Sequence, residues 1–99
     1  MIKLAGYTYV PNKACFVCQH VFDGAPVMGF AHDEEGDLQI ACSAESHSGD
    51  DWRIVCVGHL DLDRLQLVSL PTVDMGYAAE REEVTEEWVV ASLRQENGS

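Results

Sequence analysis

The clearest local pattern in this sequence is found in Val27-Met-Gly-Phe-Ala-His-Asp-Glu-Glu-Gly-Asp-Leu-Gln-Ile-Ala-Cys42. Two apolar runs flank residues 33–37, a connection with the length and the glycine expected of a hairpin loop. In the second run Leu38, Ile40 and Cys42 occupy alternate positions, so a strand would place their side chains on one face. We therefore predict a β-hairpin over residues 27–42.

Strand patterns also appear on both sides of this hairpin. Residues 4–10 are rich in β-branched and aromatic side chains and are followed by a Pro-Asn turn, which predicts an opening strand. Residues 52–57 form a further strand, and because apolar side chains occur on both of its faces we expect it to be central. Residues 77–94 fit either a strand or a helix, and for residues 86–92 we favour a strand.

One main helix is predicted over about residues 59–69. Leu62, Leu65 and Val68 follow the i, i+3 spacing of a helix face, and Pro71 would end the helix. Together these elements predict an α+β fold, in which a small antiparallel sheet packs with this helix. We expect one compact domain over residues 1–95 and a frayed tail at residues 96–99.

Composition and charge limit the classes of partner. The chain has 99 residues, of which 46% are hydrophobic, enough for one modest core. Its 17 acidic and 6 basic residues give a net charge of -11, which disfavours nucleic acid and favours a protein partner with a basic surface. No export signal and no long apolar run appear, so we expect no membrane association and a cytoplasmic location, where cysteines are free thiols or thiolate ligands and not disulfides.

Two pairs of residues have the spacing of zinc ligands. Cys15 and Cys18 form a C-x-x-C pair, and Cys56 and His59 form a C-x-x-H pair. Each pair can occupy one edge of a tetrahedral zinc site, because thiolate and imidazole are preferred zinc ligands. Three other residues offer alternative ligands: Cys42, His47 and His20.

Two other interpretations of the cysteines stay open. A set made of Cys18, His20, Cys42 and His47 would satisfy the same zinc chemistry. Cysteine is also among the most buried residue types, so Cys42 and Cys56, on the inward faces of predicted strands, can be plain core residues.

The order of these elements resembles the treble-clef zinc folds. A first ligand pair is followed by a hairpin, and a second pair lies where a strand passes into the predicted helix. The resemblance covers residues 15–69 and implies a structural zinc held by Cys15, Cys18, Cys56 and His59.

A second resemblance is to a group of small uncharacterised bacterial proteins. It is carried by His20-Val-Phe22, by Cys42 with His47 and the acidic Asp50-Asp51, and by Val57-Gly-His-Leu60. It implies a bacterial source and no particular activity.

Known catalytic signatures are missing from the sequence. Neither an H-E-x-x-H pair nor the zinc-deaminase signature is present, and the residues around Cys15 and Cys18 do not match the strand-to-helix setting of a redox C-x-x-C pair. We therefore expect a non-enzymatic, acidic protein-interaction domain with one structural zinc. The alternatives are an immunity-type inhibitor of a basic bacterial toxin and a small metal-dependent hydrolase or redox protein.

Overall fold

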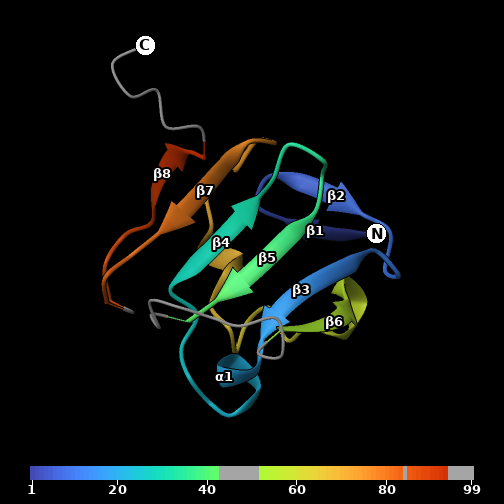
Figure 1. The fold of residues 1–99 in the computed structure, drawn as a ribbon, viewed down its shortest axis with the longest axis horizontal. Coiled ribbons are helices and arrows are strands. Elements are labelled where there is room, and N and C mark those ends of the chain that lie inside the picture. Colours follow the sequence, from blue (N-terminus) through green and yellow to red (C-terminus); the bar gives the residue numbers. More distant parts are fainter. Residues whose placement is uncertain (43–51, 84, 94–99) are drawn as a thin grey trace.

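The structure, a computed structural model, describes residues 1–42, 52–83 and 85–93. Strands dominate it, and its helical elements are single turns (Figure 1). Within the described residues the elements follow the chain in this order: β1 (Ile2–Leu4), β2 (Tyr7–Tyr9), β3 (Ala14–Cys18), α1 (Gln19–Phe22), β4 (Gly29–His32), β5 (Leu38–Ala41), β6 (Trp52–Cys56), the 3-10 turns η2 (Val57–His59) and η3 (Leu67–Ser69), β7 (Tyr77–Glu80) and β8 (Val89–Ser92).

Six of these strands form one mixed sheet. Its order is β6-β3-β5-β4-β7-β8, while β1 and β2 pair as a separate hairpin (Figure 1). Neighbouring strands of the large sheet run antiparallel except β3 and β5, which are parallel. Because parallel strands point the same way, β3 and β5 end at the same edge of the sheet.

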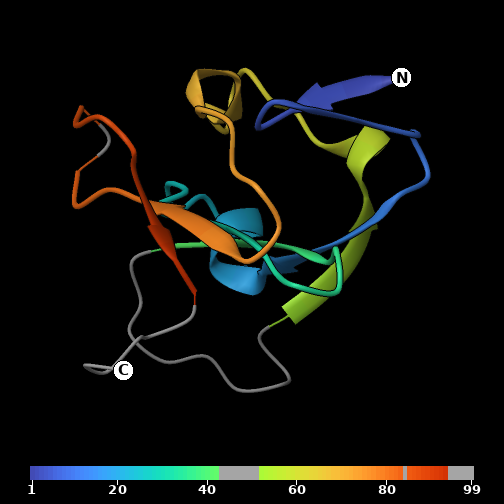
Figure 2. The ribbon, with the colours of Figure 1, turned by 90° about the horizontal axis from the view of Figure 1, so that it is seen from above.

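One face of the large sheet forms the hydrophobic core. The register pairs Cys15 with Leu38 and Phe30 with Ile40, so these four side chains share one face, and each is at most 1% exposed. Complete burial stabilises the fold by about 1.5–3 kcal/mol for a large aliphatic or aromatic side chain. The β1–β2 hairpin and the segment that contains η3 lie over this face (Figure 2). They contribute these core residues: Leu4, Ala5, Leu65, Leu67, Leu70 and Val73.

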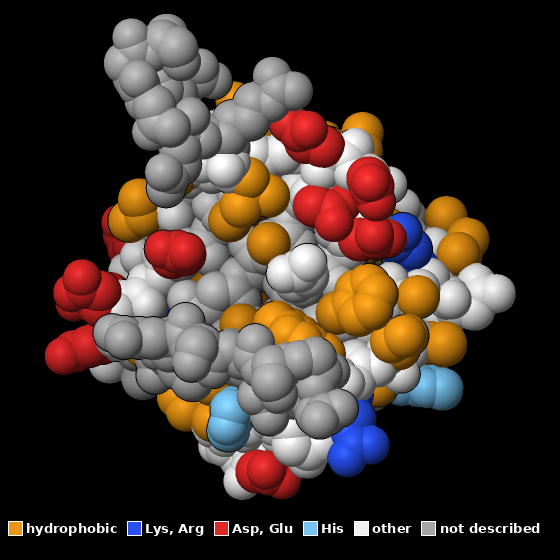
Figure 3. Space-filling view, in the orientation of Figure 1, with side chains coloured by type: hydrophobic (Ala, Val, Ile, Leu, Met, Phe, Trp, Pro, Cys, Tyr) orange, Lys and Arg blue, Asp and Glu red, His pale blue; other side chains and the backbone are white. Residues whose placement is uncertain are grey.

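The opposite face of the sheet carries exposed apolar side chains. Ile54 on β6 and Val89 on β8 are each 67% exposed. Viewed from this side, hydrophobic side chains lie in the middle of the molecule, and Asp and Glu side chains gather near the β4–β5 connection (Figure 3). The sheet therefore has one buried face and one face with exposed apolar groups.

The predicted α+β class is wrong, because the described residues form an all-β fold. Instead of one helix over residues 59–69, the chain forms two 3-10 turns separated by further turns. Gln66 has a left-handed backbone with φ of 60°, which interrupts any helix at that position. This path buries both Leu65 and Leu67, which lie two positions apart and would point to different sides of a helix.

Several strand predictions are confirmed. The hairpin predicted over residues 27–42 is β4 and β5, paired antiparallel, and the strand favoured for residues 86–92 contains β8. Residues 77–80, for which the sequence fits either state, form β7. The predicted frayed tail at residues 96–99 lies outside the described part of the chain.

Three details of the predicted strands are wrong. Residues 4–10 do not form one strand, because Ala5 and Gly6, both with positive φ, turn the chain between β1 and β2. The strand over residues 52–57 forms as β6, but at an edge of the sheet and not at its centre. The predicted all-antiparallel sheet is in fact mixed, because β3 pairs in parallel with β5.

Candidate metal centre

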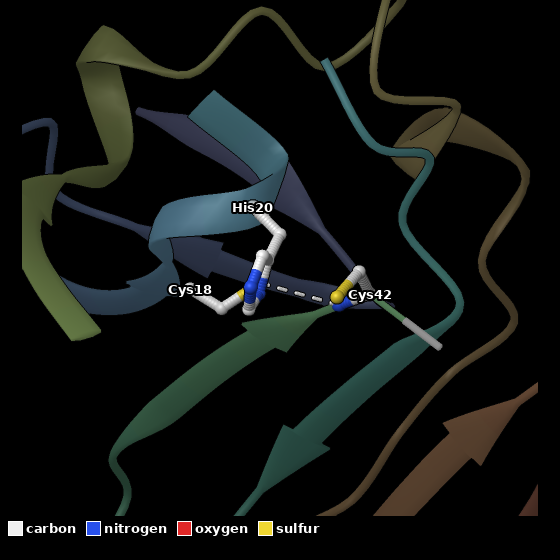
Figure 4. A group of neighbouring side chains, drawn as sticks. All are labelled: Cys18, His20 and Cys42. Atoms are coloured by element: carbon white, nitrogen blue, oxygen red, sulfur yellow. Dashed lines mark hydrogen bonds between the residues drawn. The ribbon is translucent and has the colours of Figure 1, made fainter. Parts of the chain in front are cut away.

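Three potential metal ligands meet where β3 and β5 end. Cys18 is the last residue of β3 and Cys42 directly follows β5, and the parallel pairing of these strands brings both residues to one edge of the sheet. α1 begins immediately after Cys18, and its first turn carries His20 toward the two cysteines (Figure 4). The ligand atoms of the three residues all lie within 4.8 Å of one another.

The sulfur of Cys18 is at the centre of this group. It accepts a hydrogen bond from the backbone N–H of Cys42 at 3.3 Å, and the backbone N–H of Val21 also bonds to it. The Cys18 side chain is completely buried. Burial raises the pKa of the Cys18 thiol, and the two backbone donors act in the opposite direction. Donors of this kind stabilise a sulfur atom that carries negative charge, as a metal-bound thiolate does.

The other two ligands are more accessible. His20 and Cys42 are each partly exposed, although the Nδ1 atom of His20 is buried. A metal ion could therefore reach the group from solvent while Cys18 holds it from the protein side. Figure 4 shows the side chain of His20 extending from α1 toward the hydrogen bond that joins the two cysteines.

Two thiols and one imidazole form a ligand set suited to zinc. Zinc binds sulfur at about 2.3 Å and nitrogen at about 2.0–2.1 Å in a tetrahedral arrangement, so two sulfur ligands lie about 3.8 Å apart. Ligand atoms within 4.8 Å need only a small contraction to reach that geometry. Three protein ligands fill three of the four positions, and the fourth is left to water, substrate or a further side chain.

The first predicted ligand set is not brought together in this way. β3 is extended from Ala14 to Cys18, so the side chains of Cys15 and Cys18 point to opposite faces and are separated by a rise of about 10 Å along the strand. Cys15 is completely buried in the core, where burial raises the pKa of its thiol to about 12. Cys56 ends β6, opposite Ala14 on β3, and His59 is exposed in η2.

The alternative set shares three members with the group in the structure. Of the four residues in that set, Cys18, His20 and Cys42 are the ones brought together, and His47 lies outside the described residues. The sequence predicts these residues as possible ligands, but it does not indicate that β3 and β5 are parallel neighbours. That pairing, more than the ligand spacing, selects Cys42 as the partner of Cys18.

Comparisons with family models, with curated proteins and with solved structures find no match for this chain. Among the residues that the structure describes, no helix is long and apolar enough to cross a membrane.

Proposed function

We propose that this chain is a zinc-binding protein-interaction domain, in which Cys18, His20 and Cys42 hold the metal. The observation that carries the proposal is the approach of these three ligand atoms to within 4.8 Å, with backbone N–H groups directed at the Cys18 sulfur. Two thiolates and an imidazole favour zinc over calcium or magnesium, which require oxygen ligands.

The positions of the ligands support a structural role for the metal. Cys18 and Cys42 are 24 positions apart in the sequence and lie at the ends of the two parallel strands. A zinc ion bound by both, and by His20 on α1, would link three elements that otherwise depend on sheet pairing and on core packing. Metal binding to a folded site adds directly to the free energy of unfolding.

The surface charge supports an interaction role. The net charge of -11 favours association with a basic partner by long-range attraction and does not suit binding to phosphates. The sequence contains no recognised catalytic zinc motif, so the proposal assigns the metal to stability and the surface to binding.

The zinc assignment can be tested by metal analysis of defined variants. Protein purified without added metal would be mixed with zinc, dialysed, and analysed for zinc per chain. We expect one zinc ion in the wild type and its loss in Cys18→Ser and in Cys42→Ser. Cys56→Ser is the matched control, since Cys56 does not belong to the group, and it should keep the metal. Retention by Cys42→Ser together with loss in Cys56→Ser would instead favour the set Cys15, Cys18, Cys56 and His59.

A catalytic zinc is the second candidate, and the ligand count is the observation that favours it. Three protein ligands with an open fourth position are typical of catalytic sites, whereas structural sites are closed by four. X-ray absorption of the zinc-loaded protein separates the two roles. A first shell of two sulfur atoms, one nitrogen and one light atom exchangeable with azide would support catalysis, whereas a fourth protein ligand would support the structural assignment.

A further inference from the structure

Among the residues that the structure describes, β8 is the last strand of the sheet, and its outer edge pairs with no other strand. β8 pairs with β7 on one side and is the terminal strand in the order of the sheet. The N–H of Leu93 donates to the carbonyl of Gly76, next to the first register pair of β7 and β8. Because antiparallel ladders alternate, the backbone groups of Val90 then point away from β7. An edge of this kind can accept another extended chain by strand addition.

The side chains along this edge are apolar and exposed. Val89 is 67% exposed, Val90 is 38% exposed, and Leu93, directly after the strand, is 43% exposed. β8 therefore combines the outward backbone groups of Val90 with exposed aliphatic side chains. This combination favours an occupant that supplies both backbone hydrogen bonds and apolar contacts.

A cleft of about 660 Å³ lies at the beginning of β8. Its wall is held in place by Trp88, whose indole N–H donates to Ser69 Oγ at 3.1 Å and whose ring lies 4.2 Å from the guanidinium carbon of Arg81. Arg81 also lines the cleft, but it is 8% exposed and donates to the carbonyl oxygen of Val27 through Nε and Nη2. Three acidic residues line this cleft: Asp63, Glu86 and Glu87.

A second hollow of about 440 Å³ lies at the other end of β8. Leu93 lines it, together with residues of the β4–β5 connection. Again three acidic residues contribute to it: Asp33, Glu34 and Glu35. The apolar edge of β8 thus runs between two acidic hollows.

We propose that the outer edge of β8 binds an extended segment of another protein, apolar in its middle and with a lysine or arginine at each end. Glu87 and Leu93 are six positions apart, so the two basic residues would be separated by about 20 Å, or roughly six residues of extended chain. The proposal names the surface and the partner chemistry for the proposed interaction role, and it does not depend on zinc. A second copy of this chain fits poorly, since each copy carries a charge of -11.

Binding can be measured with a defined probe. The probe is a synthetic peptide of alternating valine and threonine with a lysine at each end, six positions apart. Two control peptides carry glutamate in place of both lysines, or N-methyl groups on alternate backbone nitrogens. We expect fluorescence anisotropy to show binding of the lysine peptide that weakens steeply with salt. Equal binding of the lysine and glutamate peptides, or full binding of the N-methylated peptide, would overturn the proposal.

Variants of the protein locate the binding edge. Val90→Pro removes an outward N–H without removing a bond to β7, and we expect it to abolish peptide binding. The double change Glu86→Gln with Glu87→Gln should weaken binding roughly tenfold. Glu82→Gln with Glu83→Gln is the matched control, since these residues line neither hollow, and it should bind as the wild type does.

Two further measurements separate this inference from the zinc assignment and from self-association. Cys42→Ser should lose zinc and keep the peptide affinity, so failure of one proposal leaves the other standing. Circular dichroism shows whether the Val90→Pro variant is folded. If it is not, Val90→Lys is a second variant in which the edge of β8 is blocked. Sedimentation of the wild type should show a monomer, and a dimer that Val90→Pro dissociates would overturn the proposal in favour of a second copy.

Discussion

The backbone N–H of Cys42 donates to the sulfur of Cys18 across 3.3 Å, although the two residues are 24 positions apart in the chain. This contact exists because β3 and β5 run parallel and end together. It joins the first residue after one strand to the last residue of the other. The same contact aligns two thiols beside His20, so the topology of the sheet creates the candidate metal centre.

Removal of the metal should lower the stability of the wild type. At a free zinc concentration one hundred times the dissociation constant, binding adds about 2.7 kcal/mol to the free energy of unfolding. We expect urea unfolding of zinc-loaded protein to move to lower urea when a chelator is added. Cys18→Ser should show no such difference between the two conditions. A chelator effect of equal size in Cys18→Ser would mean that the metal is bound elsewhere.

Cys15 should resist alkylation in the folded protein. Burial raises the pKa of its thiol to about 12, so almost none is thiolate at pH 8.5. Iodoacetamide treatment of zinc-loaded protein, followed by mass spectrometry, should modify the partly exposed Cys56 and leave Cys15 unmodified until denaturant is added. Modification of Cys15 as fast as Cys56 in the native protein would contradict its placement in the core.

The same shift predicts how Cys15 contributes to stability at high pH. The folded pKa is higher than the unfolded one, so the contribution is complete below about pH 9 and is lost as the pH rises toward 12. The free energy of unfolding of Cys15→Ala should therefore fall less between these two pH values than that of the wild type. Other groups titrate in this range in both proteins, and the difference between the two slopes isolates Cys15.

Two isoleucines test the assignment of the two sheet faces. Ile40 is completely buried, whereas Ile54 is 67% exposed. Ile40→Ala should lower the free energy of unfolding by about 2–5 kcal/mol, since it leaves a cavity in the core. Ile54→Ala, the same change of side chain at an exposed site, should stay within about 0.5 kcal/mol of the wild type. Equal losses in chemical denaturation would show that the two faces are assigned wrongly.

Gly6 should be less tolerant of substitution than Gly24. Both have positive φ, of 82° and 108°, so alanine is strained at either position. At Gly6 an added Cβ would also lie 2.7 Å from the Cβ of Thr72, and rotation of the threonine side chain does not relieve that contact. At Gly24 an added Cβ meets nothing within 4 Å. We expect Gly6→Ala to be about 1–3 kcal/mol more destabilising than Gly24→Ala in thermal unfolding, whereas equal effects would exclude the clash.

The elements that the sequence predicts correctly are those with local causes. The β4–β5 hairpin depends on alternation in two short runs and on a glycine-containing turn between them. The helix predicted over residues 59–69 fails because Leu62, Leu65 and Val68 have helical spacing by coincidence. Val68 is 64% exposed, whereas Leu67 packs in the core. Core burial of the leucines outweighs their modest helix propensity.

The candidate site shows the same division between local and non-local causes. Two ligands separated by two residues can bind one metal only if the backbone turns between them, and Cys15 and Cys18 lie on one extended strand. The strand continues to Cys18 because β6 pairs with its whole length and β5 pairs along its other side. Neither partner can be identified from residues 15–18 alone.

By itself, the sequence determined the acidic charge, the ligand types, and the strands and turns whose hydrophobic alternation and glycines act over a few residues. The tertiary structure decided which of those ligands meet. Sheet pairing between β3 and β5 connects residues more than twenty positions apart, and its free energy comes from burying Cys15, Val17, Leu38 and Ile40 together in the core. Such a choice among strand partners depends on the packing of the whole sheet, which no short sequence pattern contains.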